Sequence, residues 1–260
     1  MAWGWFEAGW VRFRTLEVPL EGLPAELDGL RIAHLSDFHL GLPSRGAVAV
    51  ERAVEWTARR GPDLVCLSGD LLSRGGGEDR LRRLMARLPQ PCFAILGNHD
   101  FAISRDPFSE ATAVREVEPA TLLSDEGATI ELRGGRVHVA GSDPRARWSR
   151  RRKRPAELAV AAADADLRIL LCHYPHAIDA LPAGAFDLVL AGHMHDGQIC
   201  VPYPGGKLRL AHPTARYTNG LYRRPGGVLH VSPGLGTTFV PFRFFARPEA
   251  TELVLRRIEA

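Results

Sequence analysis

Short apolar runs alternate along the chain with segments in which apolar residues recur at helical spacing. Apolar runs bounded by glycine, proline or polar residues are typical of buried strands, whereas apolar residues at every third or fourth position predict amphipathic helices. The pattern predicts strands over residues 11–18, 31–35, 64–67, 93–96, 168–172 and 187–191, and helices over residues 47–59, 78–88 and 156–163.

Turn residues divide the remaining segments into shorter strands. Gly134 and Gly135 separate residues 129–132 from residues 136–140, which predicts a hairpin. Alternating strands and helices predict an α/β fold, and a length of 260 residues suits a single domain over residues 1–260. In the last quarter, glycine- and proline-rich turns join four segments that indicate antiparallel strands, namely residues 199–201, 208–211, 227–231 and 252–258.

Polar residues directly follow five of the predicted buried strands. Because the loops at the carboxyl ends of strands in an open α/β sheet gather at one edge, we expect these segments to meet in one crevice. Asp37 and His39 are two residues apart, as are His193 and His195, and such pairs point to the same side of an extended segment. The five polar segments are residues 36–39, 68–70, 97–100, 173 and 192–195.

These segments supply carboxylate, amide and imidazole groups and no thiolate. This donor set suits Mn, Fe, Zn, Co or Ni rather than Ca or a closed structural zinc site. Seven ligands are too many for one tetrahedral ion but suit two ions that share a carboxylate. A single histidine after a strand is more often structural, but five such segments together favour a metal site. The candidate metal ligands are Asp37, His39, Asp70, Asn98, His173, His193 and His195.

The order of these motifs resembles that of the calcineurin-like metallophosphoesterase superfamily. D-x-H, G-D, G-N-H-D, H and G-H-x-H follow one another between residues 37 and 195. The sequences at residues 30–32, 197–199 and 233–237 are also similar to the bacterial YkuE/YaeI-type phosphodiesterase branch, so the resemblance covers nearly the whole chain. The chain departs from the branch at Met194 and Asp196, which are not ligands in the family, although Asp196 adds a negative charge near the site.

The resemblance implies a fold and a set of metal ligands. The implied fold is a four-layer α/β/β/α sandwich in which a mixed central β-sandwich is flanked by helices. The implied cofactors are two divalent transition-metal ions, with Mn favoured. Asp37, His39 and His195 are the implied ligands of one ion and Asn98, His173 and His193 those of the other, with Asp70 bridging the two.

The resemblance also implies a reaction. A hydroxide that bridges the two ions attacks phosphorus in line, and the positive charges stabilise the transition state. His99 supplies a proton to the leaving group, a role that typically contributes about 10² to 10⁴ in rate. Asp100 is expected to orient His99, and both are the candidate catalytic residues.

Composition and charge narrow the class of partner. Apolar residues make up 45% of the chain and charged residues 24%, as in an ordinary globular protein. A net charge of +3 suits an anionic substrate but is too small to indicate nucleic acid, and we expect no nucleic-acid partner. Cys66, Cys92, Cys172 and Cys200 show no zinc or redox spacing, so we expect reduced core residues and a reducing compartment.

The first residues are rich in aromatic side chains. Trp3, Trp5, Phe6 and Trp10 either cover the edge of the core or touch a membrane surface, since Arg12 and Arg14 follow them closely. The segment has neither a basic start nor an apolar stretch of the kind found in export signals. We therefore expect a cytoplasmic protein, with peripheral contact at the inner membrane face as the alternative.

Other charged and polar residues allow two interpretations. Arg216, Tyr217 and Asn219 lie in a loop that resembles a substrate-side element of the branch, or they are ordinary loop residues. A basic run made of Arg147 and residues 150–154 is either a solvated loop or a contact to phosphate or anionic lipid. His34 and His138 are expected to be structural, whereas His176 and His212 remain open.

Three functions follow from this set of residues. The leading hypothesis is a metal-dependent phosphodiesterase that cleaves a phosphodiester or pyrophosphate bond in a small or lipid-linked substrate. The alternatives are a phosphomonoesterase or protein phosphatase and, from another class, a metal-binding scaffold without catalysis. Because every ligand position and His99 are filled, the sequence favours an enzyme.

Overall fold

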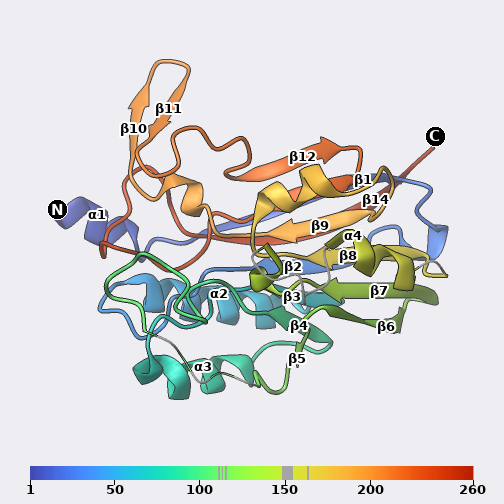
Figure 1. Ribbon diagram of the computed structural model, residues 1–260, viewed down its shortest axis with the longest axis horizontal. Coiled ribbons are helices and arrows are strands. Elements are labelled where there is room, and N and C mark those ends of the chain that lie inside the picture. The colour runs from blue at the N-terminus through green and yellow to red at the C-terminus, as the bar shows by residue number, and fades with distance from the viewer. Residues whose placement is uncertain (111, 113, 115, 148–154, 163, 260) are drawn as a thin grey trace.

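Two six-stranded sheets face each other in the computed structural model, and helices and helical turns cover their outer faces (Figure 1). The structure describes residues 1–110, 112, 114, 116–147, 155–162 and 164–259. Across the first sheet the strands follow the order β1-β14-β2-β3-β4-β5, and across the second β12-β13-β9-β8-β7-β6. This arrangement confirms the α/β fold and its four layers.

The first sheet is mixed. Strands β2 to β5 run parallel to one another, while β14 pairs antiparallel with β2 and parallel with β1. Its strands are β1 (Arg12–Glu21), β2 (Arg31–Leu35), β3 (Leu64–Ser68), β4 (Cys92–Ile95), β5 (Thr121–Leu122) and β14 (Glu249–Ile258).

The second sheet has a similar parallel centre. Strands β7, β8, β9 and β13 are parallel, and β6 and β12 close the two edges as antiparallel strands. A separate hairpin of β10 (Cys200–Tyr203) and β11 (Gly206–Arg209) leaves the chain after β9. The strands of the second sheet are β6 (Glu126–Leu132), β7 (Gly135–Gly141), β8 (Leu167–Leu171), β9 (Leu188–Ala191), β12 (Gly220–Arg224) and β13 (Gly227–Val231).

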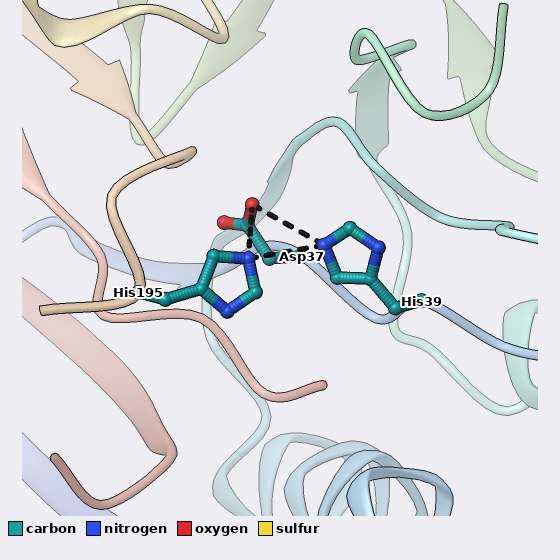
Figure 2. Close-up of side chains that lie close together, drawn as sticks. All are labelled: Asp37, His39 and His195. Carbon is teal, nitrogen blue, oxygen red and sulfur yellow. Dashed lines mark hydrogen bonds and ion pairs between the residues drawn. The ribbon is translucent and has the colours of Figure 1, made fainter. Parts of the chain in front are cut away.

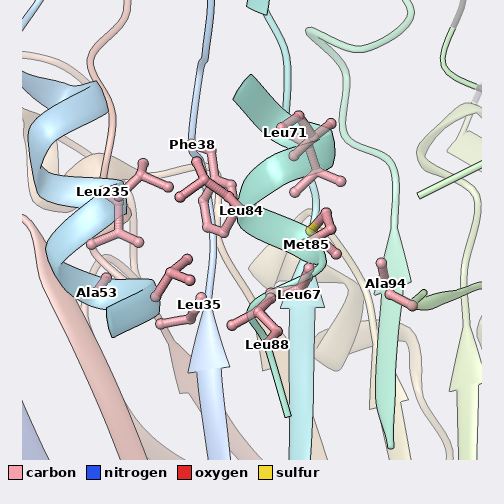
Figure 3. Close-up of a cluster of buried hydrophobic side chains, with 14 of the residues drawn as sticks. Leu35, Phe38, Ala53, Leu67, Leu71, Leu84, Met85, Leu88, Ala94 and Leu235 are labelled. Atoms are coloured by element: carbon pink, nitrogen blue, oxygen red, sulfur yellow. The ribbon is translucent and has the colours of Figure 1, made fainter. Parts of the chain in front are cut away.

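Helices cover the first sheet more fully than the second. The helix α2 (Gly46–Arg60) buries Val50, Ala53 and Val54 on one face and ends at Gly61, whose left-handed φ of 55° suits a helix C-terminus. With α3 (Glu78–Met85) it packs on the sheet through a cluster that includes Phe38, Leu67 and Leu84 (Figure 3). The remaining helices are α1 (Ala2–Glu7) and α4 (Pro155–Leu158), and helical turns lie at Ala25–Leu27, Gly75–Gly77, Pro144–Arg147, Ala159–Ala162, Pro175–Ala180 and His195–Gly197.

Side chains from both sheets fill the space between them. The cluster includes Ile32 and Leu64 of the first sheet and Ile169 and Leu188 of the second, all fully buried. Residues on both faces of these central strands are buried, which explains their nearly continuous apolar runs. All four cysteines are buried and unpaired, as the sequence predicted.

The prediction of antiparallel strands in the last quarter of the chain is confirmed in part. Strands β10 and β11 form an antiparallel hairpin, and β13 and β14 pair antiparallel with β12 and β2. On its other side, however, β13 lies parallel to β9, and β14 lies parallel to β1 along its whole length. Strand direction depends on contacts between segments far apart in the sequence, which local patterns do not encode. The predicted helix over residues 156–163 is an α-helix only to Leu158, and β5, β12 and α1 were not predicted.

Candidate metal centre

The predicted ligands from both sheets meet at the carboxyl ends of β2, β3, β4, β8 and β9. Figure 2 shows Asp37, His39 and His195 pointing toward one another. His195 Nε2 lies 3.3 Å from Asp37 Oδ1, and His39 Nε2 lies 3.8 Å from the same oxygen. The two Nε2 atoms are 3.0 Å apart. These three side chains can therefore hold one cation between them.

A second group of ligand atoms lies around Asp70. His173 Nε2 is 3.1 Å from Asp70 Oδ2, and His193 Nδ1 is 3.2 Å from His173 Nε2. The same Asp70 oxygen is 3.6 Å from Nε2 of His39, which belongs to the first group. The Asp70 carboxylate thus stands between the two groups, as a shared ligand of two ions must.

Asn98 supplies an independent test of whether this site fits metal ions. Its side-chain oxygen is buried and has no hydrogen-bond partner among the described residues. A buried polar atom without a partner costs about 1 to 3 kcal/mol, so such atoms are rare outside functional sites. The donor set, with two carboxylates, an amide oxygen and four imidazoles, fits two divalent transition-metal ions.

The ligand loops have an unusual backbone conformation. Asp37, His39, Asp70, His193 and His195 all have positive φ angles, between 47° and 71°. This region is sparsely populated for residues other than glycine and costs on the order of 1–3 kcal/mol per residue. The prediction that these residues lie in extended segments is therefore wrong. His193 and His195, which were expected to point to the same side, point into different groups of ligands.

Two glycines in the motifs are required by the carboxylates beside them. A β-carbon on Gly97 would lie 2.1 Å from Asp70 Oδ1, and one on Gly192 would lie 2.3 Å from Asp37 Oδ2. Both distances are far below van der Waals contact. The glycine before Asn98 and the glycine before His193 thus leave the space that the ligand carboxylates occupy.

The charges of the site suit cation binding. Burial alone would raise the pKa of Asp37, but the histidines around it, His195 first, lower the pKa well below its usual value. Asp70 is likewise kept ionised despite burial, because the charges of His173 and other histidines lower its pKa. Burial lowers the pKa of His39, His193 and His195, so these rings are neutral at pH 7. Ionised carboxylates and neutral imidazoles are the forms that bind metals.

His173 is the exception among these histidines. Burial lowers its pKa, but Asp70 and Asp37 outweigh this effect and raise the pKa to about 9. Its Nδ1–H donates to the backbone carbonyl of Ser68 at 2.8 Å, which leaves Nε2 facing Asp70. A proton on Nε2 occupies the place that a metal ion would take between these two residues.

His99 lies at the edge of the ligand groups and lines a cavity of about 460 Å³. Its ring centroid is 4.6 Å from that of His39, and its backbone N–H donates to Asp70 Oδ1 at 2.8 Å. Burial lowers its pKa to about 4, so the ring is neutral at pH 7. Ser109 Oγ lies 2.6 Å from Nδ1 and Ser104 Oγ lies 3.0 Å from Nε2, so two serines fix the ring's orientation.

Asp100 supports the site differently from what the sequence predicted. Its carboxylate accepts hydrogen bonds from the backbone N–H groups of Leu71, Leu72 and Gly97, at 2.8 to 3.2 Å. Burial and the nearby charge of Asp70 raise its pKa to about 7. Asp100 thus ties the loops after β3 and β4 together, whereas the serines, rather than Asp100, hold the His99 ring.

Sequence reasoning missed Arg243, a fully buried arginine behind His195. Its guanidinium donates to the carbonyls of Gly236, Pro233 and Ala246, at 2.7 to 2.9 Å, and Nη2 lies 3.1 Å from His195 Nδ1. Burial lowers its pKa only to about 10, so it stays cationic at pH 7. Arg243 lies in a loop rich in aromatic residues, and its sequence context does not indicate that it contacts a candidate metal ligand.

The cavity over the ligands contains several residues that the sequence left open or did not identify. His212 lines it, with its ring centroid 5.7 Å from that of His193. His176 lies farther along and packs against Tyr174, which also lines the cavity. The other lining residues that were not predicted are Ile103, Ser104, Arg105, Gln198, Ala211, Thr238 and Phe239.

The predicted substrate loop lies elsewhere. The residues lining the cavity do not include Arg216, Tyr217 or Asn219. Tyr217 is buried in the core under the second sheet, and its hydroxyl donates to Asp179 Oδ1 at 2.6 Å. Arg216 points to solvent with 67% of its side chain exposed. Packing and the bond to Asp179 account for Tyr217, and the contact to substrate expected of this loop stays a prediction.

The remaining polar residues have structural partners. Asp196 forms ion pairs with Lys207 and with Arg209 at 3.0 Å, so its charge is compensated within the protein. His34 lies in the core with His230 and Ser68, and His138 contacts Thr129 Oγ1 at 2.8 Å, as expected of structural residues. The basic run over residues 150–154 lies outside the described residues, as does the side chain of Arg147.

A mixed β-sandwich with this cluster of carboxylates and histidines at its strand ends defines a metal-dependent phosphoester hydrolase. The chain matches the calcineurin-like phosphoesterase family over residues 30–197, and it belongs to that family. It is 29% identical to the uncharacterized metallophosphoesterase YkoQ of Bacillus subtilis, over 93% of this chain and 89% of that protein.

Two further relatives bear on the predicted resemblance to the YkuE/YaeI-type branch. The chain is 28% identical to the uncharacterized metallophosphoesterase YkuE of Bacillus subtilis, over 90% of this chain and 82% of that protein. It is 26% identical to the UDP-2,3-diacylglucosamine pyrophosphatase LpxG of Chlamydia trachomatis, over 96% of this chain and 91% of that protein. The predicted resemblance to the YkuE branch is confirmed.

Proposed function

We propose that this protein is a phosphodiesterase that uses two divalent transition-metal ions to cleave a phosphodiester or pyrophosphate bond in a lipid-linked substrate. The observation that supports it best is a pair of ligand groups, Asp37 with His39 and His195 and Asp70 with His173 and His193, in each of which the ligand atoms lie within 4.8 Å of one another. Asp70 Oδ2 is also 3.6 Å from His39 Nε2 of the first group, which suits a ligand shared between two ions.

Each side chain has a role in this proposal. Asp37, His39 and His195 hold one ion, Asn98, His173 and His193 hold the other, and Asp70 bridges them. When bound, such ions polarise a phosphoryl oxygen and activate water at neutral pH. His99 donates an N–H to the leaving oxygen from the wall of the cavity. For this step one ring nitrogen exchanges its serine partner for the leaving oxygen, while the other nitrogen stays on its serine and fixes the ring.

The nature of the substrate is supported by a relative and by the cavity. LpxG is named for a diacylated sugar pyrophosphate, and it aligns with almost the whole of this chain. The cavity walls combine Arg105, which suits an anionic group, with the apolar Ile103 and Phe239. An anionic head with apolar chains fits such walls better than a small hydrophilic ester does.

The proposed location follows from the substrate. We place the protein in the cytoplasm with peripheral contact at the inner membrane face, where a lipid-linked substrate is accessible. The four reduced cysteines support a reducing compartment. No helix within the described residues is both long enough and apolar enough to cross a membrane.

The decisive experiment measures hydrolysis by metal-stripped protein before and after Mn²⁺ is added back. We expect metal-dependent turnover of bis(p-nitrophenyl) phosphate and of a diacylated nucleoside-diphosphate sugar, and slower turnover of p-nitrophenyl phosphate. Asp70→Asn should abolish turnover, whereas Asp143→Asn, a buried carboxylate paired with Arg145, is the matched control.

The other outcomes separate the alternatives. Faster hydrolysis of the monoester than of either diester would identify a phosphomonoesterase. Full metal binding without turnover of any of these esters, with Mn²⁺, Fe²⁺, Zn²⁺, Co²⁺ or Ni²⁺, would contradict the proposed enzyme and favour the scaffold.

A further inference from the structure

Aromatic side chains at the N-terminus are exposed rather than packed under the fold. Trp3, Trp5, Phe6 and Trp10 are 39–48% exposed. Trp3 contacts Phe6 and Trp10 with ring centroids 5.7 and 6.1 Å apart, so the three rings largely pack on one another. None of them belongs to the three apolar clusters of the core, and Trp residues of this kind favour the boundary between water and lipid.

The hairpin of β10 and β11 has one apolar face that is open to solvent. Val201 pairs with Leu208 directly across the hairpin, and Tyr203 and Leu210 lie two residues along on the same face. All four side chains are 50–58% exposed. On the opposite face, Lys207 and Arg209 bind Asp196. This face therefore exposes a row of apolar groups that no described residue covers.

A third segment, residues 239–245, joins the helix to the hairpin. The backbone N–H of Arg243 donates to the carbonyl of Gly4 at 3.0 Å, and Trp5 contacts Phe242 with ring centroids 6.4 Å apart. On the other side, Lys207 Nζ donates to the carbonyl of Phe245 at 2.9 Å. The helix α1 and the hairpin lie at the same end of the molecule (Figure 1). We call these three segments together the apolar end.

The apolar end borders the metal cavity. Gln198, just before β10, and His212, shortly after β11, both line that cavity. Phe239, which is 48% exposed, lines it as well and also forms one wall of a neighbouring apolar groove of about 420 Å³. Leu42, Phe108 and Val240 are among the other walls of this groove. The apolar groove and the metal cavity therefore adjoin each other at Thr238 and Phe239.

Positive charges outnumber negative ones at and beside the apolar end. Glu7 is the acidic residue among residues 1–16, 198–212 and 237–248, and it is buried, where it accepts the backbone N–H groups of Phe245 and Ala246. The basic residues of the same segments are Arg12, Arg14, Lys207, Arg209, Arg243 and Arg247. Arg243 is buried, Lys207 and Arg209 share one carboxylate, Asp196, and Arg12 and Arg14 share another, Glu249, so the exposed cations exceed the acids that pair with them. Exposed aromatic and aliphatic groups interspersed with cations match the headgroup region of an anionic bilayer.

We propose that the apolar end docks on a lipid bilayer that contains anionic headgroups, and that the groove beside Phe239 takes the acyl part of the substrate. This inference rests on the proposed function for the identity of the substrate. A second copy of the chain is a poorer partner, because a symmetric dimer would bring two surfaces with an excess of positive charge together. A bilayer instead supplies both the apolar layer and the negative charge.

The test is flotation of the full chain with vesicles of phosphatidylcholine alone or mixed with phosphatidylglycerol. We expect flotation with the anionic vesicles, weakened by salt. Leu208→Ser combined with Leu210→Ser, and separately Trp3→Ser combined with Phe6→Ser, should each weaken partitioning about tenfold or more. Val160→Ser, at a side chain that is 79% exposed on a helical turn outside the apolar end, is the matched control and should float like the wild type.

Each other outcome contradicts the docking proposal. Wild-type protein that floats with neither vesicle would overturn it, as would surface variants that float like the wild type. A dimer in solution that dissociates in the same variants would assign the apolar end to a second copy. Turnover of bis(p-nitrophenyl) phosphate in the same preparations tests the enzyme separately, since the surface variants leave the ligands and His99 intact.

Discussion

The last residue of β3, Ser68, contacts a buried histidine through its backbone and another through its side chain. Its carbonyl accepts a hydrogen bond from His173 Nδ1 at 2.8 Å, and its hydroxyl lies 2.8 Å from His34 Nε2. Both histidines are fully enclosed, and both follow or lie in a central strand. They nevertheless belong to two different kinds of cluster.

The cluster around His34 is a neutral chain of hydrogen bonds. The Ser68 hydroxyl donates to Ser36 Oγ at 2.7 Å and therefore accepts from His34 Nε2–H, which leaves His34 Nδ1 to accept from His230 Nδ1 at 2.7 Å. His173 instead faces the Asp70 carboxylate. The comparison teaches that burial alone does not distinguish a ligand from a structural histidine, whereas an ionised carboxylate at the second ring nitrogen does.

The contrast between a ligand and a structural histidine is tested by the same substitution at the two histidines that contact Ser68, His173→Asn and His34→Asn. His173→Asn should lose about one of two bound ions and lower kcat/KM by about 10³-fold or more, because a ligand of the reacting centre is removed. His34→Asn should keep both ions and cost about 1–3 kcal/mol of stability, because His230 loses its partner. Metal analysis and urea unfolding of both variants check this, and loss of metal from His34→Asn would contradict the assignment.

His99→Ala separates proton donation from metal binding. We expect kcat/KM for a diester to fall about 10²- to 10³-fold, since the leaving oxygen loses its hydrogen-bond donor. Metal content should not change if His99 is a proton donor, whereas loss of an ion would assign it to the ligand group that its ring forms with His39 and Asp70. A smaller loss with a leaving group of low pKa, such as p-nitrophenolate, than with an alkoxide would support the role, and equal losses would contradict it.

The neutral cluster around His34 should make the stability of the fold depend on pH. Burial lowers the pKa of His34 from 6.5 to about 3, so the unfolded chain takes up a proton before the folded protein does. Stability is therefore fully present above about pH 6.5 and falls below it, by about 1.4 kcal/mol per pH unit for one such histidine. Urea unfolding of metal-stripped protein between about pH 7 and pH 5 should show a steeper slope for the wild type than for His34→Asn.

Tyr217→Phe is expected to have the smallest effect. The substitution removes two partly buried hydrogen bonds, the one that the hydroxyl donates to Asp179 and the one that it accepts from Arg224, each worth about 1 kcal/mol of stability. It leaves the cavity untouched, so kcat and KM should stay within about twofold of the wild type. A large rise in KM for a lipid-linked substrate would support the substrate role that the sequence predicted for this loop.

The parts of the molecule that local patterns encode were predicted well. The strands around Ile32, Val65 and Leu170 are apolar runs, and the loops after them carry the ligand motifs, so both could be found from the sequence. The roles of the individual ligands and the single-domain organisation over residues 1–260 stay predictions that the experiments above address.

Features built from distant contacts could not be predicted. Arg243 reaches His195 from a loop 48 positions along the chain. Ser104 and Ser109 lie near His99 in the sequence, but serines in a loop do not by themselves indicate that they, rather than Asp100, hold its ring. The direction of β14 depends on its pairing with β1, more than 200 positions away. Side-chain type and spacing contain no information on these pairings.

The distribution of ligands over the two sheets has a consequence for assembly. Asp37, His39, Asp70 and Asn98 follow strands of the first sheet, whereas His173, His193 and His195 follow strands of the second. Each proposed ion therefore joins residues from both sheets and acts as a cross-link between them. Because a ligand that binds only the folded state stabilises it, metal supply should set how firmly the two sheets stay docked. In a cell short of metal, such a protein would lose its activity and its resistance to proteolysis together.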